Sequence, residues 1–279
     1  MIESFNLTKI YRGGLTAVNA ISFTINKRIV SIIGRNGAGK TTLLRMLSTQ
    51  LKPTSGTATI DGLDILRDPE RIRKHIVSIP QEASTLGVLT PLEHLKLFLI
   101  ARGMSVSQAT QESLIALREL EMLEAKDRPS DTLSGGMKRK VFVAMALAAN
   151  ADLTFLDEPT TGLDPVSRFE VWSAIKNLRG NIVLTTHYME EAQELSQEVM
   201  LVDSGRILEH GNVRDLLKRF EGKVRAESFQ KEEGDYSIGR TYVKYIDEED
   251  AEKYIKMGYN IRRITLDDLF VARGVEIEP

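Results

Sequence analysis

A glycine-rich segment with one lysine stands between two apolar stretches near the amino terminus. It reads Gly34-Arg-Asn-Gly-Ala-Gly-Lys-Thr-Thr42, which satisfies the pattern G-x-x-x-x-G-K-[ST]. The apolar run that ends at Ile33 predicts a strand before this loop, and the periodicity of Thr41–Leu47 predicts a helix after it. Glycines in such a loop let backbone N–H groups converge on phosphate oxygens, and the helix N-terminus adds partial positive charge. The segment therefore predicts a site for nucleotide phosphates.

Each residue type in this loop has an expected role. Lys40 should reach the β- and γ-phosphate oxygens, and Thr41 should offer its hydroxyl to Mg²⁺. A dinucleotide fingerprint is excluded, because Thr42 stands where a third glycine would be needed. The other contacts with the nucleotide are expected from Gly34, Asn36, Gly37, Ala38, Gly39 and Thr42.

A pair of carboxylates follows a second apolar run. Leu153–Leu156 predicts a buried strand that leads directly into Asp157-Glu158-Pro159. Such a pair alone is typical of a solvated turn, but beside a phosphate loop it favours a hydrolytic site. We expect Asp157 to hold Mg²⁺ and Glu158 to polarise the attacking water as general base. Pro159 disfavours helical backbone at the preceding residue, so we expect an extended conformation at Glu158.

A third motif, Asp131-Thr-Leu-Ser-Gly-Gly-Met-Lys-Arg-Lys140, precedes these carboxylates. With this motif, the sequence resembles the nucleotide-binding subunit of an ABC transporter over nearly all of residues 1–220. Ser134 is expected to cap a helix. The resemblance implies that Ser134, Gly135 and Gly136 face the γ-phosphate of a nucleotide held by a second subunit. Met137 departs from the family, in which many members have Gln, and this removes one side-chain hydrogen bond.

The resemblance also implies roles for four isolated residues. Tyr11 would stack on adenine. Gln81, after a predicted strand at Ile76–Ile79, would contact Mg²⁺ and the attacking water. Asp164 would belong to a loop that crosses the dimer interface, where its alternative role is a helix cap. His187 would contact the γ-phosphate.

The elements around these motifs indicate an α/β protein. Continuous apolar runs at Arg28–Ile33, Leu153–Leu156 and Asn181–Thr185 predict strands of a buried parallel sheet. Ser22–Ile25 and Thr57–Asp61 alternate, which predicts a half-exposed antiparallel sheet. Helical periodicity is present in Thr41–Leu47, Pro91–Ala101, Gln111–Leu123, Gly136–Ala148 and Pro165–Leu178. We therefore expect a P-loop NTPase core with a mostly parallel sheet, an antiparallel β subdomain, a helical signature subdomain and a small C-terminal α+β extension.

A shift in composition predicts a boundary near Phe220. Of the 59 residues from 221 to 279, 24 are charged, whereas 27% of the whole chain is charged. We expect a nucleotide-binding domain at 1–220, with its helical subdomain at about 88–150, and an extension at 221–279. Thr265-Leu-Asp-Asp-Leu-Phe270 resembles the tail of ATPase subunits that serve ABC-2-type exporters of drugs, lipids or polysaccharides. The alternative is an amphipathic helix that docks on its own domain.

Composition excludes several classes of protein. The chain has 279 residues, no Cys, a formal charge of −2 and 42% hydrophobic residues, which excludes disordered, collagen-like and disulfide-rich classes. Its longest apolar run, Val141–Ala149, is shorter than the ~20 residues that a membrane-spanning helix needs. The near-zero charge gives no indication of nucleic acid binding. The amino terminus has no pattern of a secretory signal, so we expect a cytoplasmic location.

Together these features predict an ATP-hydrolysing subunit that uses Mg²⁺. By resemblance, it would dimerise on ATP, with each nucleotide between Lys40 of one copy and Ser134 of the other. It would then drive export through a polytopic membrane permease from the cytoplasmic face of the membrane. One alternative is a soluble ABC ATPase not coupled to transport. The chain lacks the long coiled coil of the chromosome-maintenance members of that class. It has one cassette, whereas translation-associated members usually have two. Another is a P-loop kinase or GTPase, which the signature and His187 disfavour.

Overall fold

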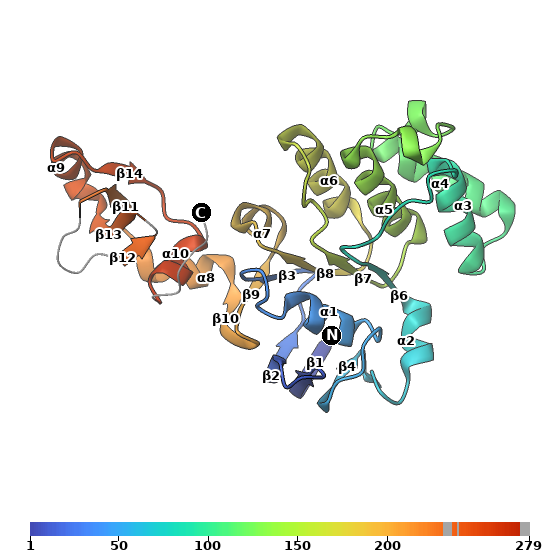
Figure 1. Ribbon diagram of the computed structural model, residues 1–279, viewed down its shortest axis with the longest axis horizontal. Coiled ribbons are helices and arrows are strands. Elements are labelled where there is room, and N and C mark those ends of the chain that lie inside the picture. The colour runs from blue at the N-terminus through green and yellow to red at the C-terminus, as the bar shows by residue number, and fades with distance from the viewer. Residues whose placement is uncertain (231–235, 239, 274–279) are drawn as a thin grey trace.

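A six-stranded sheet forms the centre of the computed structural model, which describes residues 1–230, 236–238 and 240–273 (Figure 1). The strand order is β10-β9-β3-β8-β7-β6. The strands are β3 (Ile29–Ile33), β6 (Ile76–Ile79), β7 (Leu153–Asp157), β8 (Asn181–Thr186), β9 (Glu198–Asp203) and β10 (Arg206–Asn212). All neighbours pair in parallel except β10, which is antiparallel to β9. The predicted parallel sheet is confirmed.

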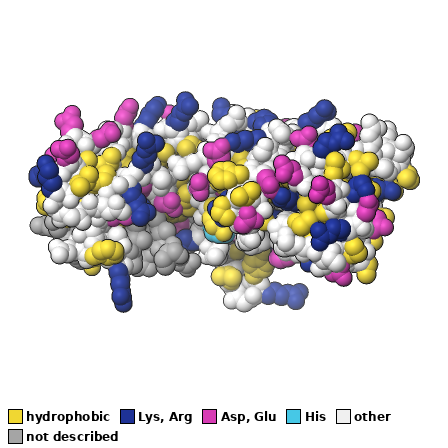
Figure 2. All heavy atoms as spheres, turned by 90° about the horizontal axis from the view of Figure 1, so that it is seen from above, with side chains coloured by type: hydrophobic (Ala, Val, Ile, Leu, Met, Phe, Trp, Pro, Cys, Tyr) yellow, Lys and Arg dark blue, Asp and Glu magenta, His cyan; other side chains and the backbone are white. Residues whose placement is uncertain are grey.

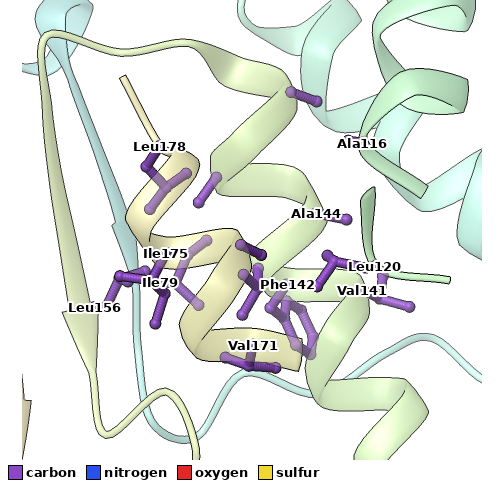
Figure 3. Packing of buried hydrophobic residues seen from close by; sticks show 14 of the residues in the cluster. Ile79, Ala116, Leu120, Val141, Phe142, Ala144, Leu156, Val171, Ile175 and Leu178 are labelled. Atoms are coloured by element: carbon purple, nitrogen blue, oxygen red, sulfur yellow. The ribbon is translucent and has the colours of Figure 1, made fainter. Parts of the chain in front are cut away.

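The largest apolar cluster lies between this sheet and the helices beside it (Figure 3). Helices α5 (Gly135–Ala149) and α6 (Pro165–Asn177) pack together, and Phe142 and Val171 are buried in their contact. Ile79 and Leu156 add strand residues to the same cluster. Continuous apolar strands are buried on both faces, which explains why β3 and β7 have no exposed residue.

A second, antiparallel sheet has the order β2-β1-β4-β5. Its strands are β1 (Ile2–Ile10), β2 (Thr16–Ile25), β4 (Ser55–Ile60) and β5 (Leu63–Asp64). Buried and exposed residues alternate toward the end of β2, as the sequence predicts for a half-exposed strand. Its buried face shares an apolar cluster with helix α1 (Lys40–Leu47), so this sheet supports the helix that follows the glycine-rich loop.

The helical region contains α3 (Pro91–Ala101) and α4 (Val106–Glu119), after the short α2 (Pro69–His75). Helix α3 has the predicted bounds, but the predicted bounds of α4 are wrong at both ends. It begins at Val106 because Ser105 and Gln108 form a capping box. It ends before Glu121, whose φ of +55° is incompatible with a right-handed helix.

The C-terminal residues form a third sheet in the order β12-β13-β11-β14. Its elements, with the neighbouring helices, are α8 (Val213–Leu217), β11 (Lys223–Ser228), β12 (Tyr236–Ile238), β13 (Thr241–Asp247), α9 (Ala251–Lys256), β14 (Asn260–Arg262) and α10 (Asp267–Val271). In Figure 1 this sheet lies at the opposite end of the molecule from α3 and α4. Residues 231–235, 239 and 274–279 of the predicted extension lie outside the described residues.

The tail segment around α10 docks on the chain's own core. Leu266, Leu269 and Phe270 are buried in one cluster with Ile33 of β3 and Ala192 of α7 (Met189–Leu195). This arrangement is the one that the amphipathic-helix alternative predicts for Thr265–Phe270.

The surface mixes both signs of charge. Figure 2 shows Lys and Arg interspersed with Asp, Glu and apolar side chains over the face that it presents. Among the described residues, no helix is long and apolar enough to cross a membrane.

Candidate active site

Four predicted motifs follow the carboxyl ends of four neighbouring parallel strands. The glycine-rich loop follows β3, His187 follows β8, Glu158 follows β7 and Gln81 lies just after β6. Because parallel strands point the same way, these residues meet at one edge of the sheet, where ligands bind in open α/β folds.

A cavity of about 620 Å³ opens at this edge, within the range of small-molecule sites. It is lined by Tyr11, Leu15, Ala17, Asn36, Gly37, Gly39, Lys40, Thr41, Thr42, Gln81, Glu158, Thr161 and His187. Most of the predicted nucleotide contacts are therefore brought together. Leu15 and Ala17 are lining residues that no sequence pattern marks, and Thr161 begins the loop that ends at Asp164.

Close packing demands glycine at two loop positions. Gly39 has a φ of +102°, and a Cβ there would lie 2.1 Å from the carbonyl oxygen of Ala17. At Gly34, a Cβ would lie 2.1 Å from the carbonyl oxygen of Val202 in β9. Gly34 and Ala38 do not line the cavity, but they belong to the loop that frames it, in which the Ala38 N–H donates to Arg35 O at 3.1 Å. The loop is therefore seated on β2 and β9.

Lys40 places a buried cation at the cavity. Its Nζ donates to the carbonyl oxygens of Gly34 at 2.8 Å and Arg35 at 3.0 Å, and lies 3.4 Å from Glu158 Oε1. Burial lowers the pKa of Lys40 from its ordinary value, while the carboxylates of Glu158 and Asp157 oppose that change. The ammonium is thus held mainly by neutral carbonyls, within reach of an anionic ligand.

Asp157 carries an oxygen that fits a hard cation. Its Oδ1 accepts hydrogen bonds from Thr41 Oγ1 at 3.0 Å and Thr185 Oγ1 at 2.5 Å. Its Oδ2 is buried without a hydrogen-bond partner, which is costly unless a ligand or ion satisfies it. Mg²⁺ prefers oxygen ligands and is often held by one or two carboxylates together with phosphates. Thr41 and Gln81 line the cavity, and Asp157 is buried next to Thr41. The oxygens of these three residues fit that ion.

Glu158 is the centre of the polar cluster. Its Oε2 lies 3.2 Å from the Gln81 Nε2 donor, 3.0 Å from the Thr161 Oγ1 donor and 3.1 Å from His187 Nδ1. The residue is 4% exposed but lines the cavity. A carboxylate held by several donors beside a polar cavity can accept a proton from a water molecule there.

The expected extended backbone at Glu158 is wrong. Its φ is +47°, in the left-handed region, which costs a non-glycine residue about 1 kcal/mol or more. The Glu158 N–H donates to the carbonyl oxygen of Thr185 at 3.1 Å and to its hydroxyl at 3.0 Å. These bonds to β8 hold the turn in a conformation that Pro159 alone does not specify.

Arg139 is a residue whose role the sequence analysis missed. Its guanidinium donates to the carbonyl oxygens of Gln81 at 3.1 Å, Asp157 at 2.8 Å and Pro159 at 3.0 Å. Burial lowers its pKa, and the nearby carboxylates oppose the change. Arg139 thus joins the signature helix to two of the site's loops. The sequence shows a basic residue after Gly-Gly-Met-Lys, but not which carbonyls would face it.

The signature residues lie apart from the cavity. Ser134 caps α5 as predicted, with its Oγ accepting from the Met137 N–H at 3.2 Å. Gly135 lines a second hollow of about 410 Å³ with Thr161 and Arg139, and a Cβ on Gly135 would meet no atom within 4 Å. Ser134, Gly135, Gly136 and Asp164 do not line the nucleotide-sized cavity.

Asp164 and Tyr11 have local partners. Asp164 Oδ1 accepts from the Ser167 N–H at 3.1 Å, so it caps α6, and hydrogen bonds from Ser167 lower its pKa. The Tyr11 hydroxyl lies 3.2 Å from Thr42 Oγ1 at the edge of the cavity. The ring of Tyr11 and the apolar side chains of Leu15 and Ala17 give this end of the cavity an apolar surface.

Comparisons with known proteins agree with this geometry. Residues 18–161 match the family model described as ABC transporter. The chain is 37% identical to the daunorubicin/doxorubicin resistance ATP-binding protein DrrA of Streptomyces peucetius, over 77% of this chain and 66% of that one. It is 36% identical to a doxorubicin resistance ATP-binding protein DrrA of Mycobacterium tuberculosis, over 75% and 64%. The chain thus spans slightly less than two thirds of the length of these relatives.

Solved structures give the same result. An ATP-binding subunit of an ABC transporter superposes with a TM-score of 0.70 and 26% identity, over 79% of this chain and 93% of that chain. A dimeric ATP-binding cassette in a post-hydrolysis state, bound to ADP and Pi, also has a TM-score of 0.70, with 27% identity over 76% and 98%. The likeness in fold extends well beyond the segment that the family model matches. The chain therefore belongs to the ABC transporter family.

Proposed function

We propose that the chain binds ATP with Mg²⁺ in the 620 Å³ cavity and hydrolyses it to ADP and phosphate. The observation that carries this proposal is the carboxylate of Glu158, which faces the cavity among Lys40, Gln81 and His187. An acidic side chain beside a phosphate loop is suited to activate a water molecule, and this supports the proposal.

In this mechanism each residue performs one step on the phosphate or the water. Lys40 leaves the loop carbonyls for the phosphate oxygens and neutralises their charge. Glu158 accepts a proton from the attacking water, while Gln81 and His187 orient that water and the γ-phosphate. Mg²⁺, when bound by Thr41, Asp157 and Gln81, supplies further charge neutralisation at the phosphates. Tyr11 provides the face on which adenine stacks.

The active assembly in this proposal is a homodimer with two composite sites. Ser134, Gly135 and Gly136 do not line their own chain's cavity, which is expected if they contact the nucleotide of a second copy. Asp164 would lie at the same interface. A dimeric ATP-binding cassette among the structural neighbours supports this arrangement.

The transport role belongs to the same proposal. Relatives named as drug-resistance ATP-binding proteins support an exporter ATPase that works with a separate membrane-spanning permease. We place the chain peripherally at the cytoplasmic face of the membrane, with the helical part at about 88–150 toward the permease. Residues 1–220 form the cassette and residues 221–279 its extension. A soluble ABC ATPase without a permease is the alternative.

Two measurements test this function. Phosphate release from Mg-ATP is measured with the purified chain and with Lys40→Ala, and the proposal requires release that the substitution abolishes. Transfer of the γ-phosphate to a small substrate instead of water would indicate a kinase. Purification from native membranes in mild detergent is expected to yield a stoichiometric polytopic partner, whereas soluble partners alone would favour the alternative.

A further inference from the structure

A buried carboxylate near the site has no role in the mechanism above. Glu191 lies on α7 and is 0% exposed. Its Oε1 accepts hydrogen bonds from Thr160 Oγ1 at 2.7 Å and from Trp172 Nε1 at 2.9 Å. Its Oε2 is buried and has no hydrogen-bond partner. The side chain is therefore fully enclosed and held through one oxygen.

The two donors come from the segment that follows Glu158. Thr160 lies between Glu158 and the Thr161–Asp164 loop, and Trp172 lies on α6, the helix that Asp164 caps. Glu191 itself lies one turn after His187. One carboxylate oxygen thus joins the helix that follows His187 to the loop and helix that follow the general base.

A second contact runs between the same two helices. The guanidinium of Arg168, on α6, lies 4.5 Å from the centre of the Tyr188 ring, and the rings of Tyr188 and His187 are 4.0 Å apart. The position of α6 is therefore linked to His187 both by Glu191 and by these contacts of the Tyr188 ring. His187 in turn contacts Glu158.

Burying this carboxylate costs free energy, so its presence calls for a role other than packing. Burial raises the pKa of Glu191, and hydrogen bonds from its neighbours oppose the rise. An apolar side chain of similar volume would avoid this desolvation. The two hydrogen bonds, unlike apolar packing, fix one relative position of α7, α6 and the loop.

We propose that Glu191 is a positioning residue of the hydrolytic site, which holds His187 and the Thr160–Asp164 loop in one arrangement by accepting hydrogen bonds from Thr160 and Trp172. Any movement of that loop toward a second copy is then transmitted to His187. This inference rests on the proposed ATP hydrolysis.

The chain contains its own reporter for this contact. Trp172 is its single tryptophan, and the indole N–H donates to Glu191. Intrinsic fluorescence therefore reports on the environment of the carboxylate. A change in emission on ATP binding is expected in the wild-type chain, because the loop and α7 shift together.

The experiment measures kcat, KM for ATP and Trp172 emission in the full chain. Thr160→Val removes one donor with little change of volume and is expected to lower kcat about tenfold, with KM within about twofold. Glu191→Gln retains an oxygen acceptor for both donors, so we expect kcat within about threefold of wild type. Glu191→Ala should lower kcat more than Thr160→Val and shift the emission. Thr154→Val, at a buried position in β7 between Val77 and Ile182, is the matched control and should leave kcat, KM and emission unchanged.

The outcomes separate this inference from the function on which it rests. If the wild type hydrolyses ATP and Thr160→Val has the same kcat, or changes KM alone, the positioning role is wrong. If Glu191→Ala does not fold, Thr160→Val still decides. If the wild type binds ATP without releasing phosphate, the proposed function fails. Emission then decides on Glu191: an equal ATP-induced change in wild type and Thr160→Val would overturn its role, and a smaller change in the variant would support it.

Discussion

Two clusters of buried charge, one beside the C-terminal sheet and one beside the central sheet, use similar residues in different settings. Beside the C-terminal sheet, Asp268 is 0% exposed. Its Oδ1 accepts from Arg225 at 3.2 Å and from the Tyr245 hydroxyl at 2.9 Å, and its Oδ2 from the Thr265 N–H at 2.7 Å. Burial and the charge of Asp268 raise the pKa of Tyr245. Both carboxylate oxygens are satisfied by the chain itself.

The cluster around Glu158 is open to a cavity, whereas the cluster around Asp268 is enclosed by the chain. It borders the cavity of about 620 Å³, and one oxygen of the neighbouring Asp157 has no partner. Leu269 and Phe270, the next residues of α10, are buried in an apolar cluster with residues of β3 and α7. Buried charge alone therefore does not mark a site of chemistry. Unsatisfied polar atoms beside a ligand-sized cavity do.

The largest expected effect is at the open cluster. Glu158→Gln removes the proton acceptor but retains the shape, so kcat should fall about 10³-fold while ATP binding persists. Because hydrolysis no longer releases the nucleotide, we expect an ATP-bound dimer. Light scattering after size exclusion at saturating ATP measures it. A variant that stayed monomeric there would contradict the composite site.

Substitution in the Asp268 cluster should change the free energy of unfolding rather than kcat. Asp268→Ala removes the carboxylate that accepts from Arg225, the Tyr245 hydroxyl and the Thr265 N–H, and should lower the free energy of unfolding by about 3 kcal/mol. Arg225 keeps its ion pair with Glu227 in this variant. Urea denaturation measures this loss. The matched control is Asp267→Ala, at the neighbouring, half-buried position. It loses one hydrogen bond from the Thr265 hydroxyl and should lower the free energy of unfolding by about 1 kcal/mol. Equal losses in the two variants would refute the distinction between them.

A substitution at Arg139 tests whether a residue that holds the loops around Glu158 also affects kcat. Arg139→Lys cannot reproduce the fork that donates to three carbonyls in two segments of the chain, so we expect about 2 kcal/mol lower stability and a lower kcat. The exposed Arg118→Lys on α4 is the control and should behave as wild type. A loss of stability with unchanged kcat would make Arg139 a scaffold residue only.

The smallest effect concerns the ion pairs of Glu209, on β10, with Arg219 and Arg273. Burial alone would raise the pKa of Glu209, but Arg219 and Arg273 outweigh it and hold the pKa below its ordinary value. The stabilisation is therefore present above the ordinary glutamate pKa and is lost as pH falls through the lowered one. Glu209→Gln should cost about 1 kcal/mol at pH 7. Denaturation across pH should show that difference shrinking below about pH 4, and a constant difference would contradict the ion pairs.

Local patterns predicted most of the cassette. Continuous apolar runs indicate parallel strands because such strands are buried on both faces, and the glycine-rich loop has one fixed relation to the strand and helix beside it. The glycine-rich loop and the Asp157-Glu158 pair could therefore be predicted from local patterns, whereas Gln81 and His187 were identified through the resemblance to the family. The bounds of α4 were missed because capping by Ser105 and a left-handed Glu121 override apolar periodicity.

By itself, the sequence determined the fold class, the family and most of the residues that line the cavity. The tertiary structure alone decided the left-handed turn at Glu158, the carbonyls that Arg139 clamps and the docking of α10 on β3 and α7. The first set depends on residue type and spacing along a single element. The second depends on hydrogen bonds and packing between segments far apart in the chain, and no local pattern records which donor will meet which acceptor.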